Sequence, residues 1–227
     1  MLSYLRLSDS LYRVMSAVQP AGFSGQTLRR LLDLLASGLL VPGGGSAAGI
    51  GGALGVSLLL MVAKLPRKRV IPAPQGDELE AVTARLWPAR DRLVHLAELD
   101  VEAYARVIDA RRLPKDSPAQ HLARHNAVQQ ALRGATDVPL EMMHICEEAL
   151  RHGIVISRHS LAGARSDCAI GIELISVALR GAARAVDANL SRFQDAVYVA
   201  RVTKQCRRFE SDATETTKSI LRALDAV

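Results

Sequence analysis

The chain has 227 residues, of which 49% are hydrophobic and 23% charged, so it holds enough apolar side chains for a packed core and is not an intrinsically disordered chain. Aromatic residues make up only 4%, which favours close-packed helices rich in Ala, Leu, Val and Gly over a β-sandwich. The net charge of +6 fits an anionic partner, either a small poly-acid or a nucleic acid, and equally a soluble surface with extra arginine.

The first 25 residues are expected to form an N-terminal extension, with a short amphipathic helix over Leu5–Val18. They lack the basic, apolar and small-residue order of a secretion signal. Three cysteines, Cys146, Cys168 and Cys206, lie far apart and form no Cys-x-x-Cys pair, so neither a disulfide framework nor a thiolate zinc site is expected. Together these features predict a cytoplasmic protein with reduced thiols.

From Leu34 to Ala63 the sequence carries no charge, a length that could cross a bilayer. The segment Pro42–Ser46 divides this stretch into two short parts. The second part, Ala47–Ala63, is rich in Gly and Ala, which let neighbouring backbones approach closely. The pattern predicts the buried central helix of a soluble protein, with Ser46 as its N-cap, and no membrane span.

The other segments show the periodicity of amphipathic helices, and none alternates as a strand over more than a few residues. Pro88 is expected to kink the longest helix. The sequence therefore predicts an all-α fold, a single-domain helical bundle of six to eight helices with long antiparallel helices over residues 26–227. The expected helices besides 47–63 are Gln26–Ser37, Asp77–Arg112, Ser117–Arg133, Asp137–His152, Ser166–Leu190 and Phe193–Ala226.

Two helix starts could bind a ligand, and each also has a purely structural explanation. The glycines of Gly43–Ser46 let a backbone approach a ligand, and the free N–H groups of a helix N-terminus attract an anion or a carbonyl oxygen. The same segment can be only a tight connection. Ser166 and Asp167 open a later helix, where the helix dipole stabilises a carboxylate, or where they act only as caps.

For several acidic, histidine and basic residues, both a functional role and a simple solvated position on the surface are possible. Asp100 shares a helix face with Tyr104, and Lys115 ends that helix, although a lone Asp is usually solvated. His121 and His125 have a spacing that can bind metal, but no third ligand is obvious, so a solvated pair is favoured and no metal site is expected. No aromatic residue interleaves with the basic run 67–69, so nucleic-acid binding is disfavoured.

Four segments, in this order, resemble one known family. They are VPGGGSAAGIGGALGVSLLLMVAKL (41–65), DVEAYARVIDARRLPK (100–115), ATDVPL (135–140) and SDCA (166–169), whose helix reaches Asn189. Together they resemble the cyclodeaminase/cyclohydrolase family of folate metabolism, which includes the C-terminal domain of formiminotransferase-cyclodeaminase and the bacterial methenyltetrahydrofolate cyclohydrolase. The turn before Ser166 differs, because it reads Leu-Ala-Gly-Ala-Arg where the family usually has Asn.

The resemblance implies hydrolysis of 5,10-methenyltetrahydrofolate to 10-formyltetrahydrofolate by a homodimer, without a metal or another cofactor besides the folate substrate. It implies that Asp100 or Asp167 orients water or balances the cationic substrate. It implies that Lys115 orients a partner carboxylate, holds the substrate or supplies a proton. The implied substrate-binding residues are Gly43, Gly44, Gly45, Ser46, Lys68, Ser166 and Asn189, with Lys68 and nearby arginines meeting the anionic glutamate tail.

Two alternatives come from different classes. The first is a cyclodeaminase, which closes formiminotetrahydrofolate to methenyltetrahydrofolate and releases ammonia. The second is a non-catalytic folate-binding or structural relative, suggested by the altered turn before Ser166 and by Ala185 in place of an expected Asn. Release of ammonia identifies the first, and binding without turnover identifies the second.

Overall fold

The computed structural model describes residues 22, 25–66 and 71–226, and within these ranges it holds six α-helices, one 3₁₀ turn and no strand. The predicted all-α fold is confirmed. The expected extension, with its helix over 5–18, lies almost entirely outside the described residues. The helices are α2 (Leu28–Ala36), α3 (Gly44–Lys64), α4 (Gln75–Arg112), α5 (Pro118–Arg158), α6 (Arg165–Leu190) and α7 (Ala196–Asp225), with the 3₁₀ turn η1 (Ala162–Ala164) before α6.

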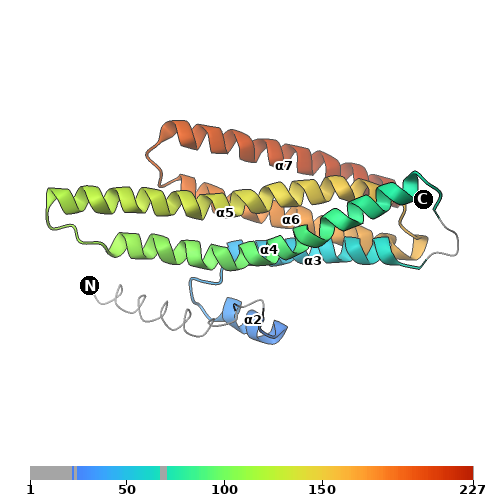
Figure 1. Cartoon of the computed structure of the whole chain (residues 1–227), viewed down its shortest axis with the longest axis horizontal. Helices are drawn as coiled ribbons and strands as arrows, with labels where there is room; N and C mark the ends of the chain where they lie inside the picture. The colour runs from blue at the N-terminus through green and yellow to red at the C-terminus, as the bar shows by residue number, and fades with distance from the viewer. Residues whose placement is uncertain (1–21, 23–24, 67–70, 227) are drawn as a thin grey trace.

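Four long helices form the body of the molecule, each antiparallel to the next (Figure 1). Helices α4 and α5 lie at the front of the view, and α3 and α6 lie behind them. Helix α3 packs against α4 and α6, and α5 packs against the same two helices, which closes a four-helix ring. Helix α7 covers the outer edge between α5 and α6. Leu54 and Met61 of α3 and Ile170 and Val177 of α6 are exposed.

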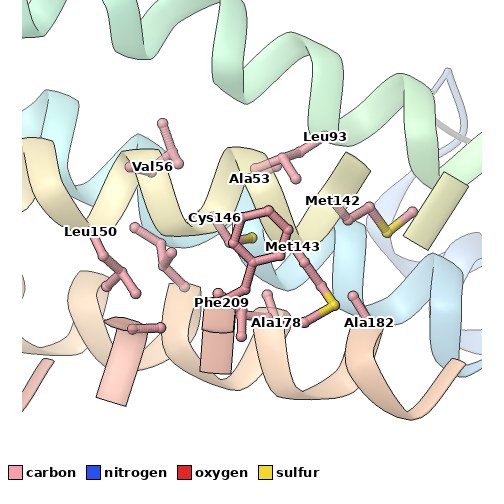
Figure 2. Close-up of a cluster of buried hydrophobic side chains, with 14 of the residues drawn as sticks. Ala53, Val56, Leu93, Met142, Met143, Cys146, Leu150, Ala178, Ala182 and Phe209 are labelled. Carbon is pink, nitrogen blue, oxygen red and sulfur yellow. The ribbon is translucent and has the colours of Figure 1, made fainter. Parts of the chain in front are cut away.

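The core between the helices is built from aliphatic and sulfur-containing side chains rather than from aromatic stacks. Figure 2 shows Leu93 of α4, Met143 and Leu150 of α5 and Phe209 of α7 around Cys146, and all five are fully buried. Burial of this apolar surface drives the packing, at about 25 cal/mol per Å² removed from water. Burial also raises the pKa of the Cys146 thiol to about 12, so this cysteine is a packing residue.

Glycines let α3 and α6 approach backbone to backbone, as the small-residue pattern predicts. A Cβ at Gly55 would lie 2.6 Å from the carbonyl oxygen of Gly171, and a Cβ at Gly171 would lie 3.0 Å from the carbonyl oxygen of Gly55. Helix α3 is long and apolar enough to cross a membrane by composition, yet 56% of its most apolar window is buried inside the bundle. Its hydrophobicity is therefore largely explained by the protein core.

Helix α4 passes through Pro88 without ending, and its ribbon bends along its length in Figure 1. The two predicted helices 117–133 and 137–152 are wrong as separate elements, because α5 is continuous from Pro118 to Arg158. Gly134 does not interrupt the helix, and the hydroxyl of Thr136 donates 2.8 Å to the carbonyl of Leu132. Asp137 is therefore not a helix cap.

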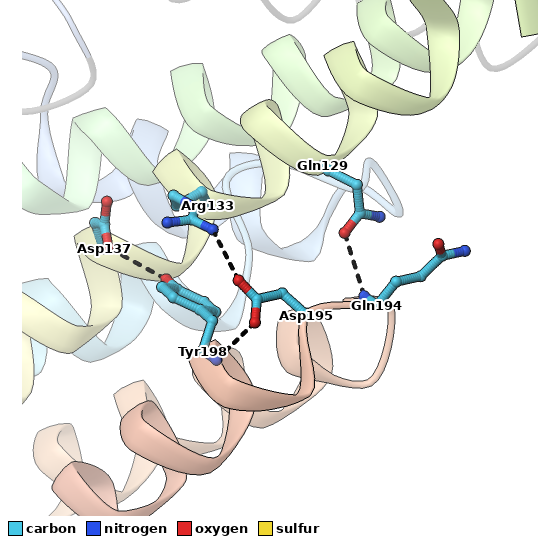
Figure 3. A network of polar contacts seen from close by, with 6 residues as sticks. All are labelled: Gln129, Arg133, Asp137, Gln194, Asp195 and Tyr198. Carbon is cyan, nitrogen blue, oxygen red and sulfur yellow. Dashed lines mark hydrogen bonds and ion pairs between the residues drawn. The ribbon is translucent and has the colours of Figure 1, made fainter. Parts of the chain in front are cut away.

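A polar network ties the start of α7 to α5 (Figure 3). The carboxylate of Asp195 accepts from the Tyr198 backbone N–H at 2.9 Å, which caps α7, and pairs with Arg133 at 3.4 Å. The Tyr198 hydroxyl donates to Asp137 at 3.4 Å. Asp137 thus acts across the helix interface rather than at a helix terminus.

Candidate functional site

The N-terminus of α3 is closed by a carboxylate from another helix. Asp100 of α4 accepts hydrogen bonds from the backbone N–H and from the hydroxyl of Ser46, with 3.2 Å between Oγ and Oδ2. Ser46 is fully buried and lies inside the first turn of α3, which begins at Gly44 with Gly43 as N-cap. The prediction that Ser46 is the N-cap is wrong, because Asp100 supplies from outside the acceptor that a local cap would give.

Gly45 makes room for this carboxylate. A Cβ at position 45 would lie 2.6 Å from Cγ of Asp100, whereas a Cβ at Gly44 would meet nothing within 4 Å. Gly43 has an extended backbone with φ of −129°, which any residue can adopt. Of the three glycines, Gly45 is the one that the close approach of Asp100 requires.

The environment of Asp100 has opposing effects on its charge. Burial raises the pKa of the Asp100 carboxyl above its ordinary value, and the two hydrogen bonds from Ser46 lower it in part. The positive end of the α3 dipole also lies at this position. The result is a half-buried carboxylate that is held in place and binds a proton more readily than a solvated Asp, which suits a general base.

A cleft of about 670 Å³ lies between the end of α4 and the start of α5. Tyr104 contributes to its wall one turn along α4 from Asp100, and Leu40 contributes from the segment before the glycines. Its polar rim carries Arg111, Lys115 and Arg124, together with Arg112 and Asp116. Four cations against one carboxylate make this an attractive surface for an anion.

Among the described residues, one of the four cations of the rim has a counter-ion and the other three have none. The Nε of Arg124 donates 2.9 Å to the carbonyl oxygen of Arg111, which joins the start of α5 to the end of α4. Arg112 pairs with Asp109 at 3.3 Å. Neither Arg111 nor Lys115 has an ion pair with another described residue. The sequence prediction did not include Arg111 and Arg124, although their position on either side of Lys115 could have indicated them.

The predicted catalytic residues do not meet within one chain. Lys115 lies 15 positions after Asp100 along α4 and its following turn, which is roughly 20 Å. Asp167 lies in the first turn of α6, which packs antiparallel to α3 and therefore begins level with the last turns of α3 rather than with its N-terminus. No hydrogen bond or ion pair joins Asp167 to another described residue. Asp100 with Ser46 and Lys115 with its cleft are therefore two neighbouring parts, and Asp167 stands apart from both.

The remaining predicted substrate-binding residues are Ser166 and Asn189 of α6, which form no hydrogen bond with Asp100, and Lys68. The helix begins at Arg165, directly after the 3₁₀ turn, with Ala164 as N-cap, so Ser166 is an exposed first-turn residue and not a cap. The Nδ2 of Asn189 donates 2.8 Å to the carbonyl oxygen of Ala135 in α5. Lys68 lies outside the described residues.

Asn189 replaces a bond that the helix cannot make. In an α-helix the carbonyl of Ala135 accepts from the N–H of residue 139, and position 139 is a proline without an N–H. The side-chain amide of Asn189 in α6 donates a hydrogen bond to this carbonyl oxygen instead. The segment 135–140 is thus linked by one hydrogen bond to the end of the helix that contains the segment 166–169.

No group of three or more His, Cys, Asp and Glu side chains is arranged to hold a metal within residues 25–66 and 71–226. His121 and His125 are both exposed on the first turns of α5. Their surroundings match the predicted solvated pair.

Known proteins are similar in sequence to this chain over most of its length. The family model for formiminotransferase-cyclodeaminase matches residues 27–208. A methenyltetrahydrofolate cyclohydrolase from Methylorubrum extorquens is 30% identical over 188 residues, which cover 83% of this chain and 90% of that protein. A formimidoyltransferase-cyclodeaminase from Gallus gallus is 24% identical, and the match covers 94% of this chain and 40% of that longer protein.

The fold is similar as well. A crystal structure of formiminotetrahydrofolate cyclodeaminase from Thermotoga maritima superposes with a TM-score of 0.79 at 21% identity, covering 89% of this chain and 98% of the other. The matched region includes the α3 N-terminus, Asp100, the cleft and the bond between Asn189 and Ala135. This chain, with its glycine-lined carboxylate and its antiparallel helices, belongs to the formiminotransferase-cyclodeaminase family, whose relatives are folate cyclohydrolases and cyclodeaminases.

Proposed function

We propose that this protein hydrolyses 5,10-methenyltetrahydrofolate to 10-formyltetrahydrofolate. The observation that carries the proposal is the half-buried Asp100 carboxylate, fixed by Ser46 and adjoining a cationic cleft. The 30% identity with a protein named methenyltetrahydrofolate cyclohydrolase, which this chain covers over 90% of its length, supports the same reaction.

The substrate carries a positive charge on the carbon that bridges N5 and N10, and Asp100 is suited to that charge. Its carboxylate accepts a proton from water while the water oxygen bonds to the bridging carbon and the C=N electrons move to nitrogen. The bond between this carbon and N5 then breaks, because the product keeps its formyl group on N10. The hydroxyl group on this carbon loses its proton as the C=O bond forms, and N5 keeps the electrons of the broken bond and takes up a proton, so one proton is released per turnover. Ser46 keeps the Asp100 carboxylate in one orientation throughout.

The cationic cleft suits the other end of the substrate. Tetrahydrofolates end in glutamate carboxylates, and Arg111, Lys115 and Arg124 present guanidinium and ammonium groups along the path from Tyr104 to the start of α5. Lys115, roughly 20 Å from Asp100 along the chain axis, then binds the tail rather than moving a proton at the one-carbon group. This role is one of those that the family resemblance implies for Lys115.

The test is the loss of methenyltetrahydrofolate absorbance in a buffer where spontaneous hydrolysis is slow, with the formyl product identified separately. Asp100→Asn is expected to fold and to lose about 10²–10⁴-fold in turnover, the usual contribution of a general base. If Asp100→Asn turns over substrate as fast as the wild type, Asp100 is not the general base.

Cyclodeamination is the second candidate, because several relatives of this chain, including the Gallus gallus protein, carry the name formimidoyltransferase-cyclodeaminase. Both reactions take place at the same carbon and need the same carboxylate. Ammonia release from formiminotetrahydrofolate distinguishes them. Binding of a tetrahydrofolate without either turnover would identify a non-catalytic relative.

A further inference from the structure

The part of the cleft that lies nearer to Asp100 is apolar. It is lined by Leu40, Tyr104 and Ile108, and the first charged side chain along α4 in the cleft is Arg111. At about 1.5 Å of rise per residue, Tyr104 lies about 6 Å from Asp100 along the helix and Arg111 about 16 Å. The spacings of four, four and three residues place all of these α4 positions on one face of the helix. We call Leu40, Tyr104 and Ile108 the apolar section.

Tyr104 is held in place by its ring. It is half-buried and packs against the small cluster of Val41, Ala97 and Val101, while it also lines the cleft. No hydrogen bond joins its hydroxyl to another described residue. The packing restricts the ring, so a flat ligand can stack on it without a large loss of side-chain entropy.

The other two members of the apolar section also fit a flat apolar ligand. Leu40 is 52% exposed, although it is a large aliphatic side chain, and Ile108 is only partly covered by the cluster behind it. Apolar walls with a few polar groups at their ends are the usual lining of a small-molecule site. Here those polar groups are the Asp100 carboxylate at one end and the cationic rim at the other.

The order of these groups along α4 is the order of groups in the proposed substrate. The bridging carbon is bonded to N10, N10 carries a benzoyl ring, and the carbonyl of that ring carries the glutamate. A substrate with its bridging carbon at Asp100 and its carboxylates at the cationic rim therefore lays its benzoyl ring along Tyr104. The reverse orientation would direct the carboxylates away from the cations and is unfavourable.

We infer that Tyr104 binds the p-aminobenzoyl ring of the substrate by stacking, and that the apolar section selects pterin carriers with an aromatic ring at N10. The inference rests on the proposed function, since it takes a tetrahydrofolate as the substrate. It assigns to Tyr104 a role in binding and specificity and leaves the chemical step to Asp100.

The inference is tested with two substrate fragments that bind without turnover. The first, p-aminobenzoylglutamate, carries the ring and the carboxylates, and the second, N-acetylglutamate, carries the same carboxylates without the ring. Tyr104→Leu is expected to weaken the first about 3- to 10-fold in ligand-detected NMR titrations and to leave the second unchanged. Tyr104→Phe keeps the ring and should bind both as the wild type does.

Three results of this titration would overturn the inference. One is an unchanged affinity of Tyr104→Leu for p-aminobenzoylglutamate. Another is an equal loss of affinity for both fragments, which would indicate a general disturbance of the cleft. The third is a wild-type protein that does not bind p-aminobenzoylglutamate at millimolar concentration.

Trp87→Leu is the matched control, because it removes an aromatic ring from the same helix. Trp87 is 36% exposed and lies outside the cleft, with the ammonium of Lys64 4.4 Å from its ring centroid. This variant is expected to keep the wild-type affinity for both fragments. A loss of p-aminobenzoylglutamate binding equal to that of Tyr104→Leu would overturn the assignment to Tyr104.

Kinetics separate this inference from the proposed function. The benzoyl ring gains no charge during the reaction, so its stacking supports substrate and transition state alike. Tyr104→Leu is therefore expected to raise KM for methenyltetrahydrofolate about 3- to 10-fold with kcat nearly unchanged, and Tyr104→Phe to restore it. A lower kcat with an unchanged KM would overturn the binding role. A wild type that binds p-aminobenzoylglutamate through Tyr104 and turns over neither folate substrate would contradict the proposed function alone.

Discussion

Gly45 and Asp100 lie so close that the Asp100 carboxylate occupies the space a side chain at position 45 would need, since a Cβ there would be 2.6 Å from Cγ of Asp100. This contact links two segments 55 positions apart in the sequence and fixes the one carboxylate that the proposed reaction uses.

The neighbouring glycines provide a matched pair of variants. Gly45→Ala is expected to push the carboxylate off Ser46, to cost about 1–3 kcal/mol in unfolding free energy and to lower turnover. Gly44→Ala is expected to be neutral or to stabilise by up to about 1 kcal/mol, because it meets nothing and Ala favours a helix. Thermal unfolding and the absorbance assay measure both. Equal behaviour of the two variants would contradict the close contact.

Asp100→Asn is expected to separate stability from activity. Burial raises the pKa of Asp100 above its ordinary value of 3.8, so this carboxyl stabilises the fold most when protonated, and that stability is lost as pH rises through the raised pKa. Asn keeps an acceptor for Ser46 and carries no charge. The variant should therefore gain stability over the wild type as pH rises from the ordinary Asp pKa of 3.8 through the raised pKa of Asp100. Denaturant unfolding at several pH values checks this, and a growing loss of stability with pH would contradict it.

The same raised pKa predicts a pH dependence of turnover. The proposed base is the ionised Asp100, so kcat/KM of the wild type is expected to fall as pH drops through the raised pKa of this carboxyl. A kcat/KM that rises on acidification, after correction for the uncatalysed reaction, would be inconsistent with Asp100 as base.

Asn189 and Pro139 are expected to be coupled. Asn189→Ala leaves the Ala135 carbonyl unsatisfied inside the bundle and should cost about 1–3 kcal/mol. Pro139→Ala supplies an N–H that can reach the same carbonyl, so Asn189→Ala should cost less in that background. The four proteins form a double-mutant cycle read by denaturant unfolding. Additive effects would show that Asn189 does not substitute for the missing N–H.

Arg111 and Lys115 are expected to act on the substrate tail. Replacing both by Ala should raise KM, more for a polyglutamylated substrate than for a monoglutamate, and should leave kcat nearly unchanged. Added salt should reduce the difference in KM between the wild type and the double variant, because it screens the charges. Exposed Arg207 and Arg208 on α7 give a control double variant of the same charge change. Loss of kcat with unchanged KM would instead assign Lys115 to the chemical step.

The sequence predicted the helical fold because its apolar periodicity and its small-residue stretches report directly on helix packing. The sequence-based prediction of helix ends failed where a residue's hydrogen-bond partner comes from a distant part of the chain. Ser46 looks like an N-cap until Asp100 is placed beside it. Asp137 looks like the start of a helix because Pro139 follows, yet Asn189 supplies the bond that lets α5 continue.

The candidate residues were likewise only partly predictable. Asp100, Ser46 and Gly45 are brought together, as the family resemblance implied, whereas Asp100 and Asp167 are separated along the antiparallel helices. Sequence order carries no information on that separation, because it depends on the register between α3 and α6.

The most direct measurement is the loss of 5,10-methenyltetrahydrofolate absorbance with the wild-type protein and with Asp100→Asn. We expect protein-dependent hydrolysis to 10-formyltetrahydrofolate in the wild type, and a folded Asp100→Asn variant whose turnover is lower by about 10²-fold or more. A folded wild-type protein that does not accelerate the hydrolysis would contradict it.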